Sequence, residues 1–193
     1  RPELLRIFAL NIAPAATYYT LFVYAATWIA EATPVSRAAA LDLTTLSIVT
    51  FLAVVLIAAW ASDRYGRRTL VIAGMSACVV LAYPLVWLMA HGTIASIAAG
   101  QMIFSALLAV YMAPIPAAMC EAFPHAVRVS AVSVGYGLAY AIFGGTAPAV
   151  AVWLIGRTGD PTAFVWYLIA LTGVSLAFAL TIRPHHNIQP AAR

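Results

Sequence analysis

The sequence of 193 residues contains no lysine, and only 8% of its residues are charged. Its ten basic residues are all arginine, and with six acidic residues they give a formal net charge of +4. Soluble domains carry charge on roughly a quarter of their residues. Because so few charges cannot cover a water-exposed surface, the composition excludes a soluble domain and a disordered segment. Ten scattered arginines form no continuous basic patch, so we expect no nucleic-acid partner.

Cysteine is also scarce, since Cys78 and Cys120 are the only two in the chain. Two cysteines are too few for a disulfide framework or a zinc site. Both lie in apolar runs, and we expect both to be buried as small packing residues.

Hydrophobic residues make up 64% of the chain. They lie in five stretches without Asp, Glu, Lys or Arg, which are 7–30, 43–62, 69–120, 129–156 and 161–182. A transmembrane helix needs about 20 apolar residues, so the third stretch is long enough for two, with a turn at His91-Gly92-Thr93. The runs lack the polar alternation of outer-membrane barrel strands. We therefore predict an all-α membrane protein with six transmembrane helices, over residues 7–30, 42–62, 69–90, 94–120, 129–156 and 162–182.

Arginine is distributed unevenly between the two sides that six spans define. The side of both termini has eight: Arg1, Arg6, Arg64, Arg67, Arg68, Arg128, Arg183 and Arg193. The other side has only Arg37 and Arg157. Since cytoplasmic loops carry the excess of basic residues, we expect both termini in the cytoplasm. The membrane that we expect to hold the chain is a bacterial inner membrane.

Prolines interrupt the first and fourth predicted helices. Pro14 follows Asn11 in the first, and Pro114 and Pro116 lie close together in the fourth. A proline removes a backbone donor, and in lipid the freed carbonyl needs another partner or a water-lined cavity. Interrupted helices at corresponding positions indicate a 3+3 repeat and a transporter binding site. The alternative is that proline is simply more frequent in membrane helices than in soluble ones.

The turn between the second and third predicted helices concentrates charge. Asp63, Arg64, Arg67 and Arg68 surround Gly66, which permits a backbone conformation that other residues avoid. The arginines alone fit a contact with lipid headgroups. That alternative leaves Asp63 unexplained, because a negative charge at a helix C-terminus opposes the helix dipole. We therefore expect Asp63 to have a partner outside its own helix, such as the N-terminus of another helix.

Three motifs resemble the major facilitator superfamily. The Asp-Arg-x-Gly-Arg-Arg run that begins at Asp63 resembles the family's cytoplasmic loop motif, although Ala59 stands where the family usually has glycine. The Glu-x-Phe-Pro-x-x-x-Arg pattern from Glu121 to Arg128 resembles the element between the family's tenth and eleventh helices. The run from Tyr136 to Pro148 resembles the eleventh helix of its metabolite–proton symporter branch, which carries citrate, 2-oxoglutarate, shikimate, proline or betaine.

The resemblance implies that the chain forms helices seven to twelve, the C-terminal half of a twelve-helix transporter. The family holds substrate between its halves, so the implied partners are a small-molecule substrate, the lipid bilayer and a missing N-terminal six-helix half. The implied activity is proton-coupled symport of a small polar metabolite, an organic acid, by alternating access. No cofactor is implied, because the proton gradient supplies the energy. The resemblance also implies a conformational role for the residues of the two charged motifs, which are Asp63, Arg64, Gly66, Arg67, Arg68, Glu121 and Arg128.

No Asp, Glu, Lys or Arg lies in the middle of a predicted span, so we expect the proton-coupling carboxylate in the missing half. Polar side chains are then the candidates for lining a substrate cavity: Asn11, Thr17, Thr20, Tyr24, Gln101, Ser105, Tyr136 and Tyr140. Each has the alternative of a hydrogen-bonded helix contact or an interfacial aromatic. Trp28, near a span end, fits the interfacial belt better. We expect Asn11, Thr17 and Gln101 to face lipid if the half stands alone.

Glycine and proline mark candidate packing or hinge positions: Pro14, Pro114, Pro116, Gly144, Gly145 and Pro148. The favoured function is a transporter half, and the alternative is a non-transporting membrane assembly or enzyme subunit. An intramembrane enzyme needs sets of His, Asp and Glu, or of Ser with His, inside its spans, and none is present. We therefore expect no enzyme activity.

Overall fold

The computed structural model describes residues 2–121 and 128–181, and within these ranges all regular structure is helical. The first pass consists of α1 (Pro2–Tyr19), the π-helical turn η1 (Thr20–Tyr24) and α2 (Ala25–Ala32). It is followed by α3 (Arg37–Tyr65), α4 (Arg67–His91), α5 (Ile94–Met112) and α6 (Ile115–Glu121). The chain ends with α7 (Arg128–Ala139), the π-helical turn η2 (Tyr140–Gly144), α8 (Gly145–Thr158) and α9 (Phe164–Leu180).

Five helical segments of the described chain are long and apolar enough to cross a membrane. They are Glu3–Ala32, Arg37–Tyr65, Arg67–His91, Ile94–Glu121 and Arg128–Thr158. The sixth predicted span corresponds to α9, which has 17 residues, equivalent to about 26 Å of helix. A hydrocarbon core is about 30 Å thick, so α9 falls slightly short of a full crossing. The predicted span 162–182 is longer because Thr162 and Ala163 belong to the preceding turn, and residue 182 lies outside the described residues.

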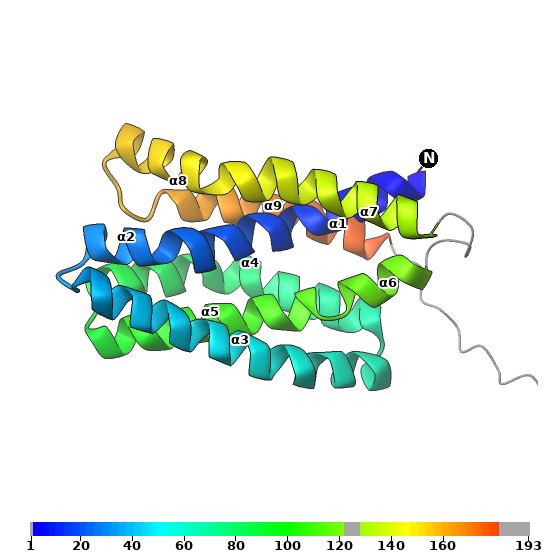
Figure 1. The fold of residues 1–193 in the computed structure, drawn as a ribbon, viewed down its shortest axis with the longest axis horizontal. Coiled ribbons are helices and arrows are strands. Elements are labelled where there is room, and N and C mark those ends of the chain that lie inside the picture. Colours follow the sequence, from blue (N-terminus) through cyan, green and yellow to red (C-terminus); the bar gives the residue numbers. More distant parts are fainter. Residues whose placement is uncertain (1, 122–127, 182–193) are drawn as a thin grey trace, which may run out of the picture.

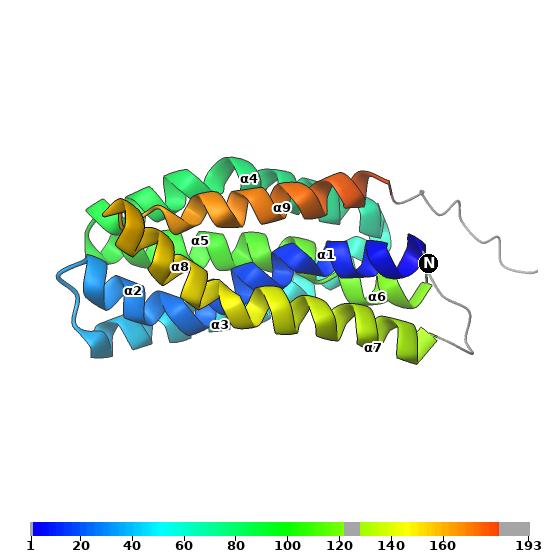
Figure 2. The same cartoon turned by 90° about the horizontal axis from the view of Figure 1, so that it is seen from above.

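The helices lie side by side along the long axis of the molecule, and the start of α1 and the end of α9 are at the same end (Figure 1). Figure 2 shows three layers: α4 and α9 on one side, α1 and α5 in the middle, and α3 and α7 on the opposite side. Contacts agree with this order, because α4 packs on α5 and α9, α3 packs on α5, and α1 packs on α9 and α7. The middle layer therefore holds the first and fourth passes, the two that proline interrupts.

Burial differs strongly between the layers. The apolar window of the first pass is 72% buried, whereas the windows of α3 and of the pass from α7 to α8 are each 22% buried. The first pass is thus the centre of the bundle. By contrast, α3 and the α7–α8 pass leave most of their surface uncovered by this chain.

Capping residues explain where several helices begin and end. Ser36 accepts a hydrogen bond from the Ala39 N–H at the start of α3, and Thr93 accepts one from the Ser96 N–H at the start of α5. Gly159 ends α8 with a left-handed φ of 72°, which favours glycine. The long helices extend past the charge-free windows of the sequence because charged residues continue the helices beyond their apolar parts, as Arg37 and Arg64 do in α3.

Two side chains differ from their predicted surroundings. Cys78 is buried as expected, but Cys120 is exposed, because α6 reaches the end of the bundle there. Trp28 is 2% exposed instead of lying in an interfacial belt. Its indole N–H donates to the Pro161 carbonyl at 2.7 Å, so the polar end of the ring is satisfied inside the protein.

Candidate functional site

Arg67 joins the two charged motifs at one end of the bundle. Its guanidinium lies 3.0 Å from the Glu121 carboxylate at the end of α6 and 3.5 Å from the Asp63 carboxylate near the end of α3. The side chains of Arg67, Glu121 and Asp63 are 28%, 46% and 72% exposed. The predicted partner of Asp63 outside its own helix is therefore the side chain of the first residue of α4. One arginine connects three helix ends.

Arg68 extends this connection to the last helix. Its Nη2 donates to the Leu180 carbonyl oxygen at 3.0 Å, at the C-terminus of α9, where a cation is favoured by the unpaired carbonyls. The neighbouring Arg64 points elsewhere, with its guanidinium 5.7 Å from the centroid of the Trp60 ring. The adjacent residues Arg67 and Arg68 thus link the start of α4 to three other helices, α3, α6 and α9.

The turn that carries these arginines depends on Gly66. This residue has a φ of 93°, a conformation that side-chain-bearing residues rarely adopt, and it is the single residue between α3 and α4. Arg128, the other predicted charge at this end, is half-buried at the start of α7. Phe123 and Pro124 of the same motif lie outside the described residues.

Pro14 lies where a hydroxyl from another helix enters the first pass. Ser175 of α9 donates to the Ala9 carbonyl at 2.7 Å and accepts from the Ala13 N–H at 3.0 Å. These two backbone groups pair with each other in an uninterrupted α-helix. An inserted hydroxyl of this kind bends a helix, and here it lies directly before the proline. Ser175 was not among the predicted site residues, because α9 reads as a uniformly apolar helix.

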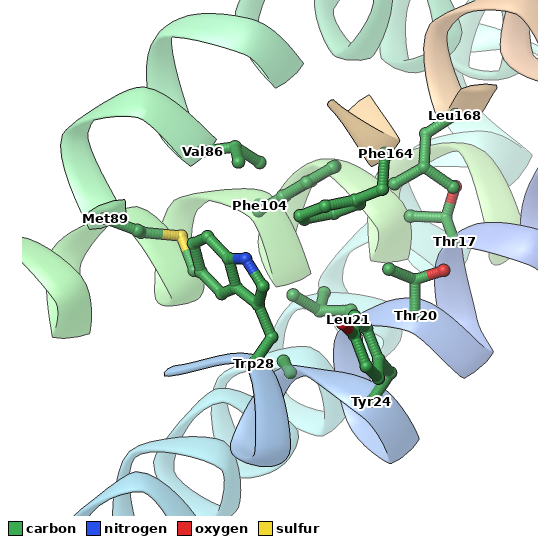
Figure 3. A pocket seen from close by; sticks show the side chains of 11 residues that line it. Thr17, Thr20, Leu21, Tyr24, Trp28, Val86, Met89, Phe104, Phe164 and Leu168 are labelled. Atoms are coloured by element: carbon green, nitrogen blue, oxygen red, sulfur yellow. The ribbon is translucent and has the colours of Figure 1, made fainter. Parts of the chain in front are cut away.

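The polar residues of the first pass point into the bundle. Asn11 is 1% exposed, and its side-chain amide donates to the Ile7 carbonyl at 2.8 Å and contacts the Met119 sulfur at 3.0 Å. Thr17, Thr20 and Tyr24 line a cavity of about 20 Å³, which has room for about one water molecule. Figure 3 shows this cavity, with Trp28 and Met89 at one end and Thr17 at the other. The cavity is much too small for a metabolite.

The polar residues of α5 are also internal. Gln101 is fully buried, and its Nε2 donates to Thr44 Oγ1 of α3 at 3.3 Å. Ser105 is fully buried and donates to the Met102 carbonyl at 2.9 Å. The prediction that Asn11, Thr17 and Gln101 would face lipid in the half alone is therefore wrong. Asn11 and Gln101 instead bind side chains of neighbouring helices, and Thr17 lines an internal cavity.

Some buried polar atoms keep unused hydrogen-bonding capacity. Among the described residues, those without a partner include Thr17 Oγ1, Gln101 Oε1 and the hydroxyls of Tyr111 and Tyr140. The Tyr111 hydroxyl lies near the side chains of Thr17 and Cys78, so α1, α4 and α5 meet around it. In the middle of a bundle, such atoms mark places where water or a ligand can bind.

The predicted packing and hinge residues differ in their position along the helices and in the space around them. Pro114 lies in the break between α5 and α6, Pro116 lies in the first turn of α6, and Pro148 lies in the first turn of α8. A Cβ atom at Gly144 would lie 2.8 Å from the Tyr19 ring, so this glycine permits close packing of the fifth pass on the first. A Cβ atom at Gly145 would meet nothing within 4 Å.

Two π-helical turns, which the sequence did not reveal, lie near the middle of the first and fifth passes. The turn η1 of the first pass packs against α8, and the turn η2 of the fifth pass packs against α1. Tyrosines lie in or beside both turns, including Tyr19, Tyr24 and Tyr140. Turns of this type occur frequently at functional sites. Tyr136 and Tyr140, the two predicted cavity residues of the fifth pass, stack with ring centroids 4.1 Å apart.

Comparison with known proteins places these features in a family. The sequence profile of the Major Facilitator Superfamily matches residues 7–192. The chain is 28% identical over 182 residues to the ectoine/proline transporter of Corynebacterium glutamicum, an alignment that covers 92% of this chain and 36% of that protein. It is 27% identical to the proline/betaine transporter of Salmonella typhimurium, covering 98% of this chain and 39% of the relative.

A third relative is a symporter of a different compound, citrate. The chain is 30% identical over 170 residues to the citrate-proton symporter of Salmonella typhi, covering 86% of this chain and 39% of that symporter. The chain thus spans less than two fifths of the length of each of these relatives. All three are transporters rather than enzymes. With its several apolar helices and a profile match over nearly its whole length, this chain belongs to the Major Facilitator Superfamily of multi-pass membrane proteins.

Proposed function

We propose that the chain is the C-terminal half of a secondary transporter that moves a small polar metabolite together with protons by alternating access. In this proposal α9 completes a sixth span, the six passes form a 3+3 repeat, and an N-terminal six-helix half covers the side of α3 and α7. The low burial of α3 and of the α7–α8 pass supports this arrangement, because both leave a large surface for another helical layer or lipid.

The observation that carries the proposal is the contact of Arg67 with both Asp63 and Glu121. Partly exposed ion pairs contribute only about 0–1 kcal/mol. A link of that strength between the ends of α3, α4 and α6 can form in one conformation and break in another at little cost. Such a link suits a transporter whose halves rock against each other in every cycle.

The substrate is proposed from the relatives and from the charges of the spans. The relatives are transporters of ectoine and proline, of proline and betaine, and of citrate with protons. A small organic acid or zwitterion fits this group. Since no Asp, Glu, Lys or Arg lies in the middle of the described spans, the proton-coupling group is proposed to belong to the other half.

Uptake by the complete protein that carries this chain tests the function. The protein is reconstituted in vesicles with an inwardly directed proton gradient, and radiolabelled citrate, proline and glycine betaine are added separately. Saturable uptake of at least one compound, abolished by a protonophore, is the expected result. Absence of uptake for all three, with a folded and correctly inserted protein, favours the alternative of a non-transporting membrane subunit.

Orientation is tested by cysteine labelling. We propose from the distribution of arginine that both termini are cytoplasmic. We also propose the inner membrane of a bacterium, because the relatives are bacterial proteins. In a variant with Cys120→Ser, an impermeant thiol reagent added outside the cell should label Ala95→Cys and leave Tyr65→Cys unlabelled. Both positions are exposed at opposite ends of the bundle. The reverse pattern contradicts the orientation.

A further inference from the structure

Six aromatic side chains from three passes come together near the middle of the bundle. We call them the aromatic cluster: Tyr18, Tyr19, Phe22, Phe51, Tyr136 and Tyr140. The Tyr18 ring is at its centre, with ring centroids 4.9 Å from Phe22 and 6.2 Å from Phe51 of α3. Phe22 and Phe51 are 5.4 Å apart, so the first pass and α3 share one continuous group of rings.

The fifth pass brings the remaining two rings to the same group. Tyr136 and Tyr140 stack on each other, and the Tyr140 hydroxyl lies within electrostatic reach of Tyr18 and Tyr19. Close approach of the two passes is possible because Gly144 leaves space for the Tyr19 ring. The cluster therefore extends across the first pass from α3 to η2, and both π-helical turns lie beside it.

The position of the aromatic cluster separates it from ordinary membrane aromatics. Interfacial tyrosines lie near span ends, whereas Tyr18, Phe51 and Tyr140 lie near the middle of their passes. The helices that carry them form the middle layer and the layer opposite α4 and α9 (Figure 2). Phe51 is buried, four of the rings are half-buried, and Tyr136 is 38% exposed. Phe51 thus belongs to the hydrophobic core, whereas the other rings leave part of their surface uncovered by this chain.

The electrostatics of the aromatic cluster favour a positive charge. The faces of aromatic rings are negative, and a cation over them gains more when it is removed from water. No arginine or lysine lies in the middle of these passes to neutralise an anion. The Tyr140 hydroxyl adds a second feature, because it is a buried polar group without a hydrogen-bond partner among the described residues.

We infer that the aromatic cluster binds the ammonium group of a zwitterionic substrate, with a quaternary ammonium compound as the best fit. The inference rests on the proposed transport function and makes it more specific, because it selects zwitterions over polyanions such as citrate. The rings hold the positive end of the substrate by cation–π contacts. The substrate's carboxylate is left for groups outside this chain.

The test compares two probes of the same shape in the complete purified protein. Glycine betaine carries a trimethylammonium group, and 3,3-dimethylbutanoate has the same skeleton with an uncharged carbon in place of the nitrogen. Calorimetric titration should show binding of glycine betaine, with 3,3-dimethylbutanoate at least about tenfold weaker. Equal affinity for the two probes, or binding of citrate without binding of glycine betaine, overturns the inference.

Substitutions then locate the site. Tyr18→Leu and Tyr136→Leu should each weaken glycine betaine binding by about tenfold, while Tyr18→Phe and Tyr136→Phe, which keep the ring, should stay within about twofold. Tyr83→Leu is the matched control, because Tyr83 is a similarly exposed tyrosine of α4 that pairs with Trp166, on the opposite side of the bundle. Unchanged binding in both leucine variants of the cluster, or an equal loss in Tyr83→Leu, contradicts the assignment.

Binding is measured without a proton gradient, so the two proposals can fail separately. If the protein takes up citrate in vesicles but does not bind glycine betaine, the proposed transport function stands and the proposed aromatic site is contradicted. If the protein binds glycine betaine through these rings but shows no uptake of any of the compounds, the proposed site stands and the proposed transport function is contradicted.

Discussion

The Arg67 guanidinium and the Glu121 carboxylate lie 3.0 Å apart, and each belongs to a different sequence motif. The first motif lies between α3 and α4, and the second follows α5 and α6. The chain therefore brings both motifs to one end of the bundle and joins them through the Arg67–Glu121 ion pair. Asp63 shares the same arginine.

The ion pair should make a small contribution to stability. In a double-mutant cycle with Arg67→Gln and Glu121→Gln, we expect a coupling free energy below about 1 kcal/mol, because both side chains are partly exposed and screened by water. Thermal unfolding of the complete protein in detergent measures it. A coupling of several kcal/mol contradicts a link that breaks in each transport cycle.

Asp63 should affect the rate of transport more than substrate binding. Asp63→Asn removes the negative charge that faces Arg67, at an end of the bundle far from the middle of the spans. We expect the maximal uptake rate to fall several-fold while equilibrium substrate affinity stays nearly unchanged. A large loss of binding with a normal rate of conformational cycling is the opposite outcome.

Ser175 should stabilise the first pass before Pro14. Ser175→Ala removes the hydroxyl that binds Ala9 and Ala13, and a lost buried hydrogen bond of this kind costs about 1 kcal/mol. The same substitution at the exposed Ser133 of α7 is the control and should change little. Thermal unfolding in detergent compares the two variants, and equal effects argue against a specific role of Ser175.

Gly74 should tolerate no side chain. A Cβ atom there would lie 2.9 Å from Tyr111 Cβ and 3.0 Å from the Tyr111 backbone nitrogen, so Gly74→Ala must push α4 away from α5. We expect a loss of about 1–3 kcal/mol. Gly137→Ala meets nothing within 4 Å and should be neutral or slightly stabilising, because alanine favours helix. Comparable unfolding temperatures for both variants contradict the close contact of α4 with α5.

Asp160 should make the stability of the α8–α9 turn depend on pH. Hydrogen bonds from the Thr162 backbone N–H and hydroxyl, at 2.8 and 2.7 Å, lower the pKa of this carboxyl below its usual 3.8. The carboxylate therefore stabilises the fold above the unfolded-state pKa, and this contribution is lost as the pH falls through the lower native value. Asp160→Ala should lower the unfolding temperature at pH 7, and the difference from wild type should shrink toward pH 3.

The same profile for Asp160→Asn separates charge from shape. Asparagine keeps an acceptor oxygen for Thr162 without the titrating group. Its difference from wild type should therefore decrease on acidification like that of the alanine variant, but from a smaller value at pH 7. A difference that grows at low pH contradicts the sign of the pKa shift.

Apolar runs and turn residues predicted most of the helices, because a membrane span must be long and apolar whatever it packs against. They did not predict which way a polar side chain points. In lipid the outward-facing residues are as apolar as the buried ones, so periodicity does not identify the inner face of a span. Asn11 and Gln101 were expected to face lipid in the half alone because they were assigned to a cavity between two halves, although they bind neighbouring helices instead.

The motifs of the candidate site were likewise predicted from the sequence, whereas the contacts between them were not. The charged turn at Asp63 and the motif at Glu121 were predicted as separate features, and their connection through Arg67 required the tertiary structure. The π-helical turns and the insertion of Ser175 left no sequence signal, since both depend on contacts between passes distant in sequence. The aromatic cluster also combines residues from three passes.

The central proposal is that this chain supplies one half of a two-half transporter. Reconstituting residues 1–193 alone, beside the complete protein that carries them, and measuring proton-driven uptake of the same metabolite tests it most directly. We expect saturable, protonophore-sensitive uptake by the complete protein and none by the chain alone, which has no Asp, Glu, Lys or Arg in the middle of a span. Saturable uptake by the chain alone that a protonophore abolishes would contradict the proposal.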